Sequence, residues 1–377
     1  MDNRAPQGAS TLELFFDLVF VFALTQVSAF LVEHGDVAGL ARGALLLAML
    51  WWMWSTFTWT TNWTGTETAA IRLALLAGMG VSLAMAQAVP DAFEDGGAWF
   101  AVTYFIVRLI SVALSWLGAG ANQAQREALL TFLPLATVAP LLVLVGGFLD
   151  SPWRTVLWVL AFAVDLISAI SAGRGTWQIQ ARHFAERNGL FVIIALGESI
   201  VAIGLGVVGE ERSATLALSL GVVFVGAAAL WWSYFDKPAQ DAERYLAEAN
   251  DKEQGRFARD AYSILHYPII LGIVLYAVGA EDVVAHPDDA LDGFNRFALS
   301  VGVALVLLAV VAAAYRAVRR VPTERFVAGI VLIGLALFGG ELSALRLAAL
   351  VDVVLIASLV IEHRNRARLD AERSSVG

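Results

Sequence analysis

The sequence contains no cysteine, so disulfide bonds, cysteine-bound metals and thiol nucleophiles are excluded. Charged residues are also scarce: they make up 16% of the 377 residues, against about 25% in a typical soluble domain. Lysine occurs only at Lys237 and Lys252, and no basic patch with interleaved aromatic residues suggests a nucleic-acid partner. Neither a phosphate-binding glycine loop nor a serine-nucleophile elbow is present, and no cofactor is implied.

Hydrophobic residues, by contrast, make up 59% of the chain and occur in long continuous runs. Only helices or closed barrels satisfy the backbone inside lipid. The strict alternation of a barrel strand is missing. The sequence therefore predicts an all-α, polytopic integral membrane protein, whose first partner is the lipid bilayer.

We predict about twelve transmembrane helices, since a span needs roughly 20 apolar residues. Eleven spans is the main alternative, because only Glu341 and Leu342 separate the last two. Residues 1–377 form a single membrane domain, with a cytoplasmic loop at 236–260 that includes a short helix after Pro238, and a cytoplasmic tail at 363–377. The predicted spans are 11–33, 38–61, 69–90, 97–119, 127–148, 153–173, 187–208, 213–235, 260–279, 294–315, 323–340 and 343–362.

The loop charges predict the orientation. With a cytoplasmic N-terminus, 19 of the 25 Lys and Arg residues fall on the cytoplasmic side and Arg108 lies within the membrane. This bias follows the positive-inside rule. We expect a bacterial inner-membrane protein with both termini in the cytoplasm. The first span carries Glu13 and Asp17 and lacks a cleavage site, so we expect it to be retained.

The two halves of the chain, 11–173 and 187–362, resemble each other faintly. LFFDLVFVFALTQVS near the start is echoed by GLFVIIALGESIVAI, and WWMWSTF by WWSYFD. Six helices in each half would give a parallel repeat. Chance likeness between apolar helices is the alternative.

Several charged residues fall inside predicted spans, where they must be paired, protonated or hydrated. Glu13 and Asp17 share one helix face; the alternative for both is a helix-start role that complements the dipole. Arg108 belongs to a polar stripe on its helix. The alternative to a functional role for Arg108 is a structural ion pair that ties helices together. The remaining acids within the spans are Asp165, Glu198 and Asp352, whose alternative is a role in helix packing.

The acids Asp17, Asp165, Glu198 and Asp352 outnumber the one base within the spans, Arg108. One of these acids can pair with Arg108. The other three must bind protons or cations, face water, or pair with His266 or with arginines at helix ends. Such an excess is what a proton or cation pathway needs. Gly189, Gly197, Gly204 and Gly206 around Glu198 predict close helix packing.

A second group of candidates lies at the predicted cytoplasmic face: Glu13, His183, Glu186, Arg187 and Asp236. His183 and Glu186 superficially suggest a metal pair, but no second histidine lies at ligand spacing, so we predict no metal. The sequence is also rich in tryptophan: it has twelve, of which four lie in the span 38–61 and a fifth, Trp63, lies just after it. An interface belt with core packing is one interpretation, and an aromatic-lined cavity is the other.

Four stretches resemble the bacterial low temperature requirement A (LtrA) family: ELFFDLVFVFALTQVS (13–28), WTTNW (59–63), ARHFAERNGLFVIIALGESIVAIG (181–204) and WWSYFD (231–236). The resemblance implies a multi-helix membrane protein named for a growth requirement in the cold. It brings no established substrate, reaction or catalytic residue, so the candidate residues above rest on physical grounds alone.

Our leading hypothesis is a secondary transporter coupled to a proton or cation and carrying a small solute. Glu198 would bind the coupling ion, Asp17 and Asp165 would complete the path, and Arg108 would be a counter-ion or anion contact. The alternatives are a membrane enzyme acting on lipid or isoprenoid through His183, Glu186, Arg187 and Asp236, or a sensor or scaffold. The sequence leaves the substrate and the oligomeric state open.

Overall fold

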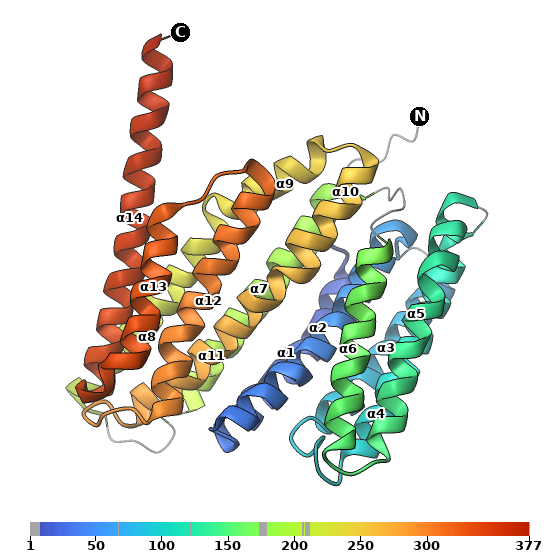
Figure 1. Cartoon of the computed structure of the whole chain (residues 1–377), viewed down its shortest axis with the longest axis horizontal. Helices are drawn as coiled ribbons and strands as arrows, with labels where there is room; N and C mark the ends of the chain where they lie inside the picture. The colour runs from blue at the N-terminus through green and yellow to red at the C-terminus, as the bar shows by residue number, and fades with distance from the viewer. Residues whose placement is uncertain are drawn as a thin grey trace. The chain divides into compact units, whose positions relative to one another are not determined.

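The chain folds into long helices joined by short turns (Figure 1). The structure is a computed structural model that describes residues 8–66, 68–120, 123–172, 179–205, 207 and 212–376. Over these residues the only β pairing is an isolated bridge between Ala290 and Ser343. The predicted all-α class is confirmed.

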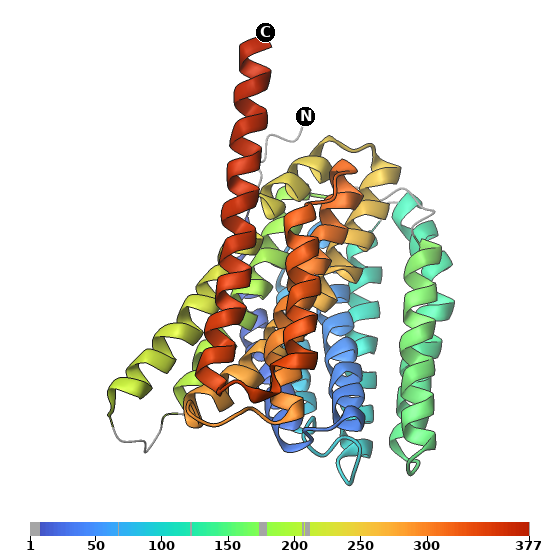
Figure 2. The same cartoon turned by 60° about the vertical axis from the view of Figure 1, so that its left-hand side comes forward.

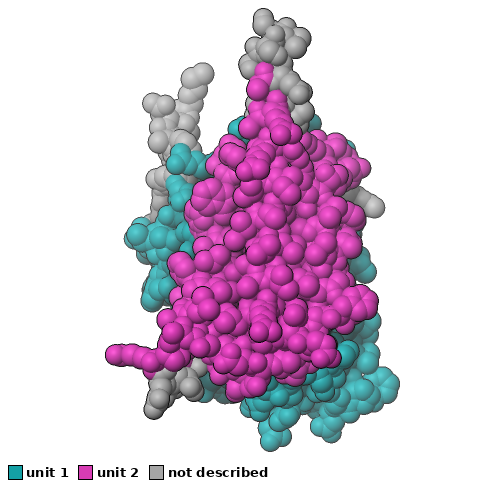
Figure 3. All heavy atoms as spheres, turned by 90° about the vertical axis from the view of Figure 1, so that its left-hand side faces the viewer, with its two compact units in different colours: residues 1–194, 243–267 teal, residues 195–242, 268–377 magenta. Residues whose placement is uncertain are grey.

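Two compact units make up the chain, and each is discontinuous in sequence (Figure 3). The first unit contains residues 1–194 and 243–267, and the second contains 195–242 and 268–377. The chain therefore passes from one unit to the other within three helices: α7 (Ala181–Leu205), α9 (Pro238–Glu248) and α11 (His266–Ala285).

The first unit is built on its first six helices and the beginning of α7. α1 packs against α2 and α3, α4 packs against α2, α3 and α5, and α6 packs against α5 and α2. A short α10 (Asp251–Phe257) continues into a π-helix, η1 (Ala258–Ile264), and both belong to this unit. The bounds of the first six are α1 Thr11–Glu33, α2 Val37–Thr64, α3 Ala69–Gln87, α4 Gly97–Ala119, α5 Gln123–Gly147 and α6 Trp153–Ala172.

The second unit is built around α12, which packs against α8, α13 and α14 (Figure 2). The last helix of this unit, α14, also packs against α8 and α13 and then extends past them to the C-terminus. A 3₁₀ turn, η2 (Gly339–Glu341), separates the last two helices. The bounds are α8 Ala214–Phe235, α12 Gly293–Val318, α13 Thr323–Phe338 and α14 Ala344–Val376.

The helix starts follow from short polar side chains in the sequence. The Ser10 side chain accepts a hydrogen bond from the Glu13 backbone, and the Glu13 carboxylate accepts one from the Ser10 backbone N–H, forming a capping box at α1. Asp36, Thr68 and Ser213 cap α2, α3 and α8 in the same way through their side-chain oxygens. Each cap satisfies backbone N–H groups that have no partner within the helix.

Among the described residues, eleven helices are long and apolar enough to cross a membrane. The remaining predicted span corresponds to α5, which has 25 residues and contains Pro134 and Pro140. Large apolar side chains remain exposed along the spanning helices, for example Leu73, Phe224 and Val327. This pattern is expected for surfaces that contact lipid.

Two details differ from the sequence-based spans. The fourth helix matches 97–119, whereas α7 begins at Ala181 rather than at 187, so that the charged residues before 187 are helical. The short helix expected after Pro238 is present as α9. It is followed by α10 and η1, so the predicted loop 236–260 is mostly helical.

Two of the glycines predicted to allow close packing on α7, Gly197 and Gly204, do not do so. A Cβ added at Gly197 or Gly204 would meet nothing within 4 Å; Gly206 lies outside the described residues. The close approach instead occurs between α11 and α12. There, a Cβ on Gly272 would lie 2.5 Å from the Gly302 carbonyl oxygen. Small residues allow such contact only where two helices actually cross.

Candidate functional site

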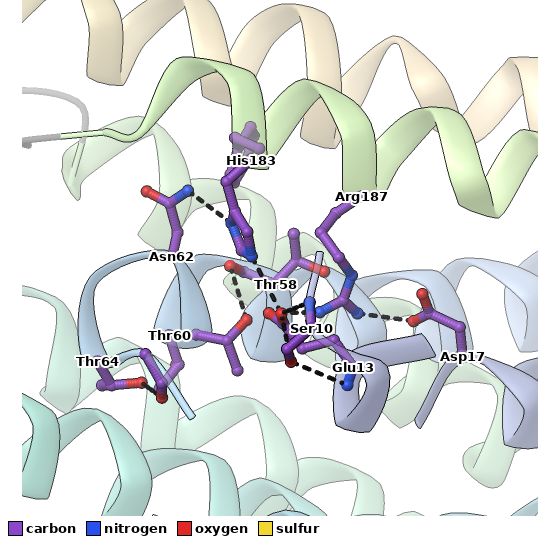
Figure 4. A network of polar contacts seen from close by, with 12 residues as sticks. Ser10, Glu13, Asp17, Thr58, Thr60, Asn62, Thr64, His183 and Arg187 are labelled. Atoms are coloured by element: carbon purple, nitrogen blue, oxygen red, sulfur yellow. Dashed lines mark hydrogen bonds and ion pairs between the residues drawn. The ribbon is translucent and has the colours of Figure 1, made fainter. Parts of the chain in front are cut away.

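Four charged or titratable side chains meet inside the first unit (Figure 4). Glu13 and Asp17 lie four residues apart on α1, and His183 and Arg187 lie four residues apart on α7, so each pair occupies one helix face. Arg187 Nη1 lies 2.8 Å from Glu13 Oε1, and Arg187 Nη2 lies 2.6 Å from Asp17 Oδ1. His183 Nε2 lies 3.1 Å from Glu13 Oε2. We call these four residues the charge cluster.

Residues of α2 fix the charge cluster in place. Trp54 Nε1 donates a hydrogen bond of 2.7 Å to Asp17 Oδ1, and the Arg187 guanidinium lies over the Trp54 ring at 5.6 Å. Asn62 Nδ2 lies 3.1 Å from His183 Nδ1. All of these side chains are buried, so the cluster holds α1, α2 and α7 together through desolvated polar contacts.

The structure thus assigns partners to several sequence candidates. Glu13 caps α1, as its helix-start alternative expected, and also binds α7. Asp17 pairs with an arginine from a helix end, one of the options left open for it. His266 lies elsewhere, with its Nδ1 atom 2.7 Å from the Ala261 carbonyl. Glu186 is exposed on α7, outside the cluster.

A separate buried ion pair joins α4 and α6 of the same unit. Arg108 Nη2 lies 2.7 Å from Asp165 Oδ1 and donates a second bond, of 3.2 Å, to the Ala136 carbonyl on α5. Trp52 and Tyr104 also approach the Asp165 carboxylate. Arg108 Nε is buried and has no hydrogen-bond partner among the described residues. The ion pair and the Ala136 bond therefore do not use all five N–H donors of this guanidinium.

A pocket of about 850 Å³, including its open mouth, lies beside Arg108. α2, α4, α5 and η1 form most of its wall, and Ala169 of α6 and Gly255 of α10 complete it. The described lining side chains are three indoles, six hydroxyls, two arginines and apolar groups: Trp52, Ser55, Thr56, Trp59, Thr60, Trp63, Arg108, Ser111, Val112, Ser115, Leu129, Leu133, Ala136, Arg259 and Ser263.

Hydroxyl groups cross the pocket wall as a ladder between α2 and α4. Ser111 Oγ donates to Thr56 Oγ1 at 3.2 Å, and the Thr60 and Ser115 hydroxyl oxygens lie 2.7 Å apart. Thr60 Oγ1 and Ser115 Oγ also lie within hydrogen-bond distance of carbonyl oxygens of their own helices, those of Thr56 and Ser111, so two hydroxyl protons are shared among three contacts. The ladder therefore uses most of its donors within the protein.

The π-helix η1 supplies the opposite wall of the pocket. Trp51 Nε1 donates to the Ser263 carbonyl at 2.7 Å, and Trp59 Nε1 donates to Ser263 Oγ at 2.9 Å. Ser55 Oγ adds a 3.1 Å bond to the same hydroxyl. Trp51 and Trp59 thus anchor η1 to α2, and Trp52, Trp59 and Trp63 line the pocket. Single π turns of this kind occur frequently at functional sites.

The second unit holds Glu198 and Asp352, both buried. Glu198 lies on α7 beside Ser199, which donates to the Ala195 carbonyl. Asp352 lies on α14 next to Tyr276, whose hydroxyl donates to the Val223 carbonyl on α8. A Cβ on Gly226 would lie 2.5 Å from Asp352 Oδ1 and closer still to the Tyr276 hydroxyl. Gly226 therefore makes the space in which this carboxylate sits.

Asp236, the remaining candidate, caps the C-terminal end of α8 in the second unit. It is half-buried, and its charge acts on Arg325 of α13. Arg325 Nε lies 2.5 Å from Glu362 Oε2 on α14, and its Nη1 donates to the Ser233 carbonyl at 2.7 Å. Asp236 thus belongs to a different unit from His183 and Arg187.

Sequence reasoning missed Trp54, Asn62, Arg325 and Glu362 as partners of the charged groups. One signal for the charge cluster was present in the sequence. Glu13 and Asp17 form an acidic i, i+4 pair, and His183 and Arg187 form a matching basic pair. For Arg325 and Glu362 no comparable spacing exists, because each stands near the end of its own span.

The fold and these sites define a multi-pass helical membrane protein whose spans carry buried ion pairs. Comparison with known proteins is consistent with this class. The family model described as "Bacterial low temperature requirement A protein (LtrA)" matches residues 8–360, so the chain belongs to this family. The chain is also 34% identical, over 311 residues, to an uncharacterized protein of Rhizobium meliloti (strain 1021). That match covers 79% of this chain and 75% of the relative.

Proposed function

We propose that the protein is a secondary permease of the bacterial inner membrane that carries a small solute together with, or in exchange for, a proton or cation. The observation that carries this proposal is the pocket of the first unit. It lies among membrane-spanning helices and combines indoles, hydroxyls and guanidinium groups. A concave site with an apolar wall and a few convergent polar groups is typical of small-molecule binding.

The buried charges support a transport role for the surrounding helices. Asp165 and Asp17 are neutralised by Arg108 and Arg187, so these pairs can hold helices together at membrane depth without exposing a bare charge to lipid. Opening and re-forming such pairs is a way to couple helix motion to ion binding. We assign the coupling ion to Glu198, with Asp352 as a second carboxylate of the same unit.

The orientation completes the proposal. The distribution of Lys and Arg supports an orientation with both termini in the cytoplasm. A lipid-modifying enzyme has less support, because His183 and Arg187 are buried against Glu13 and Asp17, and Asp236 belongs to the other unit.

The test is ion flux into proteoliposomes under imposed pH, sodium and potassium gradients. Wild-type protein is compared with Glu198→Gln at equal amounts of folded protein, and Glu186→Gln, an exposed position on the same helix, is the matched control. We expect flux in the wild type and in Glu186→Gln, and its loss in Glu198→Gln. Flux that survives Glu198→Gln removes Glu198 from the path. An absence of flux under every gradient contradicts the permease and favours a scaffold.

A further inference from the structure

We infer that the pocket of the first unit binds an amphipathic organic anion. Its acidic group would be received by Arg108 and its apolar body by the tryptophans of α2. This inference rests on the proposed permease, whose solute site it describes, and it names the chemical class of that solute.

The charge of the pocket wall is the first argument. The described lining residues include Arg108 and Arg259 and no acidic side chain. The carboxylates that balance these arginines, Asp165 and Asp260, are bound to them but are not part of the lining. Each ion pair therefore presents its positive end to the pocket. This arrangement gives the pocket wall a positive potential, which favours an anion.

The second argument is the unused donor of Arg108. Its Nη2 atom is occupied by Asp165 and by the Ala136 carbonyl, whereas its buried Nε has no partner among the described residues. A buried donor without an acceptor is costly. A guanidinium also matches the oxygens of a carboxylate better than those of a neutral group. Because Arg108 lines the pocket and its printed bonds use only Nη2, its guanidinium keeps hydrogen-bonding capacity for an acceptor oxygen of the solute.

The third argument concerns the rest of the solute. Trp52, Trp59 and Trp63 present indole surface, and Leu129 and Leu133 add aliphatic surface. The hydroxyl groups of the ladder form their hydrogen bonds with one another and with backbone carbonyls, as Thr60 and Ser115 show. A sugar or another polyol would need many free hydrogen-bonding groups, so the pocket suits an apolar body instead.

An organic cation is the main competitor, because tryptophan faces bind quaternary ammonium groups. Two guanidinium groups in the same wall would repel such a ligand. The charge of the solute thus separates these two alternatives, and three probes of one shape can test it. We choose 3-phenylpropionate, the neutral 3-phenylpropanamide and the cationic 2-phenylethyltrimethylammonium.

The experiment is titration calorimetry of the full-length protein in lipid nanodiscs. We expect 3-phenylpropionate to bind at least tenfold more tightly than the amide or the ammonium probe. In the double variant Arg108→Gln/Asp165→Asn, which keeps the pair neutral and so avoids a stranded charge, the preference for the anion should disappear. Arg182→Gln, an exposed arginine of the same unit that does not line the pocket, should bind as the wild type does.

A second variant guards against misfolding of the first. Val112→Trp fills the pocket while leaving the ion pair in place, and it should abolish binding of 3-phenylpropionate. Equal or tighter binding of the ammonium probe or the amide overturns the inference. So does unchanged preference in the folded double variant, or binding of none of the three probes.

The outcome is separable from that of the flux test. Binding of the anion without any ion flux leaves the anion site standing and removes the permease. Ion flux in a protein that prefers the cation keeps the permease and overturns the anion site.

Discussion

Arg187 on α7 and Asp17 on α1 stand 170 residues apart in the sequence, yet their side chains form a buried ion pair of 2.6 Å. The same guanidinium reaches Glu13 through its other terminal nitrogen. One arginine thus satisfies two carboxylates of the first helix. This relationship ties the opening of the chain to the most family-like stretch of its middle, ARHFAERNGLFVIIALGESIVAIG.

Breaking this pair on one side should destabilise the protein strongly. Arg187→Gln leaves Asp17 and Glu13 buried without their cation, and removing one partner of a buried pair costs about 3–5 kcal/mol. Thermal unfolding of the detergent-solubilised protein, followed by size-exclusion chromatography after heating, measures the effect. Asp17→Asn combined with Arg187→Gln should recover part of the lost stability. Arg182→Gln changes an exposed side chain and should unfold at the same temperature as the wild type. An unchanged unfolding temperature in Arg187→Gln would contradict the structural role of Arg187.

The anchoring of η1 by α2 predicts coupling between Trp59 and Ser263. Trp59→Phe removes the donor of the 2.9 Å bond to Ser263 Oγ and should cost about 1–3 kcal/mol. Ser263→Ala removes the acceptor, so a double-mutant cycle should show that the two losses are not additive. Trp153→Phe, at a tryptophan that is 64% exposed, is the control and should leave unfolding unchanged. Additive losses would mean that the bond contributes nothing to the π-helix.

The space around Asp352 can be tested with two glycines of one helix. Gly226→Ala places a methyl group 2.5 Å from Asp352 Oδ1, so the Asp352 and Tyr276 side chains or the helices that carry them must move, at a cost of about 1–3 kcal/mol. Gly221→Ala on the same helix meets nothing within 4 Å and should be neutral or slightly stabilising. Thermal unfolding again supplies the measurement. Similar behaviour of the two variants would contradict the close approach of α8 to Asp352.

Glu362→Gln should loosen the contact between α13 and α14. Arg325 then keeps only its bonds to Ser233 and loses the buried carboxylate, which predicts a cost of about 3–5 kcal/mol. Hydrogen exchange should rise in α13 and in the adjoining part of α14. His363→Gln changes the exposed neighbour and should exchange as the wild type does. Unchanged protection in Glu362→Gln would show that the pair does not hold these helices.

The helical class and most spans could be predicted, because lipid forces long apolar runs into helices whatever their neighbours are. Thr11–Glu33 and Gly97–Ala119 match the predicted segments. The start of α7 was predicted too late, because His183 and Arg187 look like loop residues in isolation. Their place in a helix depends on acids supplied by α1, and a hydropathy pattern carries no information on such a distant partner.

The candidate site was predictable to a similar extent. Arg108 and Asp165 were both predicted to be candidate functional residues within the spans. The sequence does not show which acid pairs with which arginine, because residue type alone carries no information on spatial neighbours. The role of Ser263 was not foreseeable at all, because it depends on a π-helix that brings its hydroxyl to Trp59. Packing on Gly226, Gly272 and Gly302 rather than on Gly197 depends likewise on which helices cross.

The discontinuity of the first unit also sets an order of events during synthesis. When the ribosome has completed residue 242, α1 to α7 and the whole charge cluster exist, but Gly255, Arg259 and Ser263 have not been made. The nascent chain at that moment has the tryptophans of α2 without the segment they anchor. A fragment ending there would retain the residues of the cluster and lack the part of the pocket wall that α10 and η1 supply, so only a longer translation product can form the whole pocket.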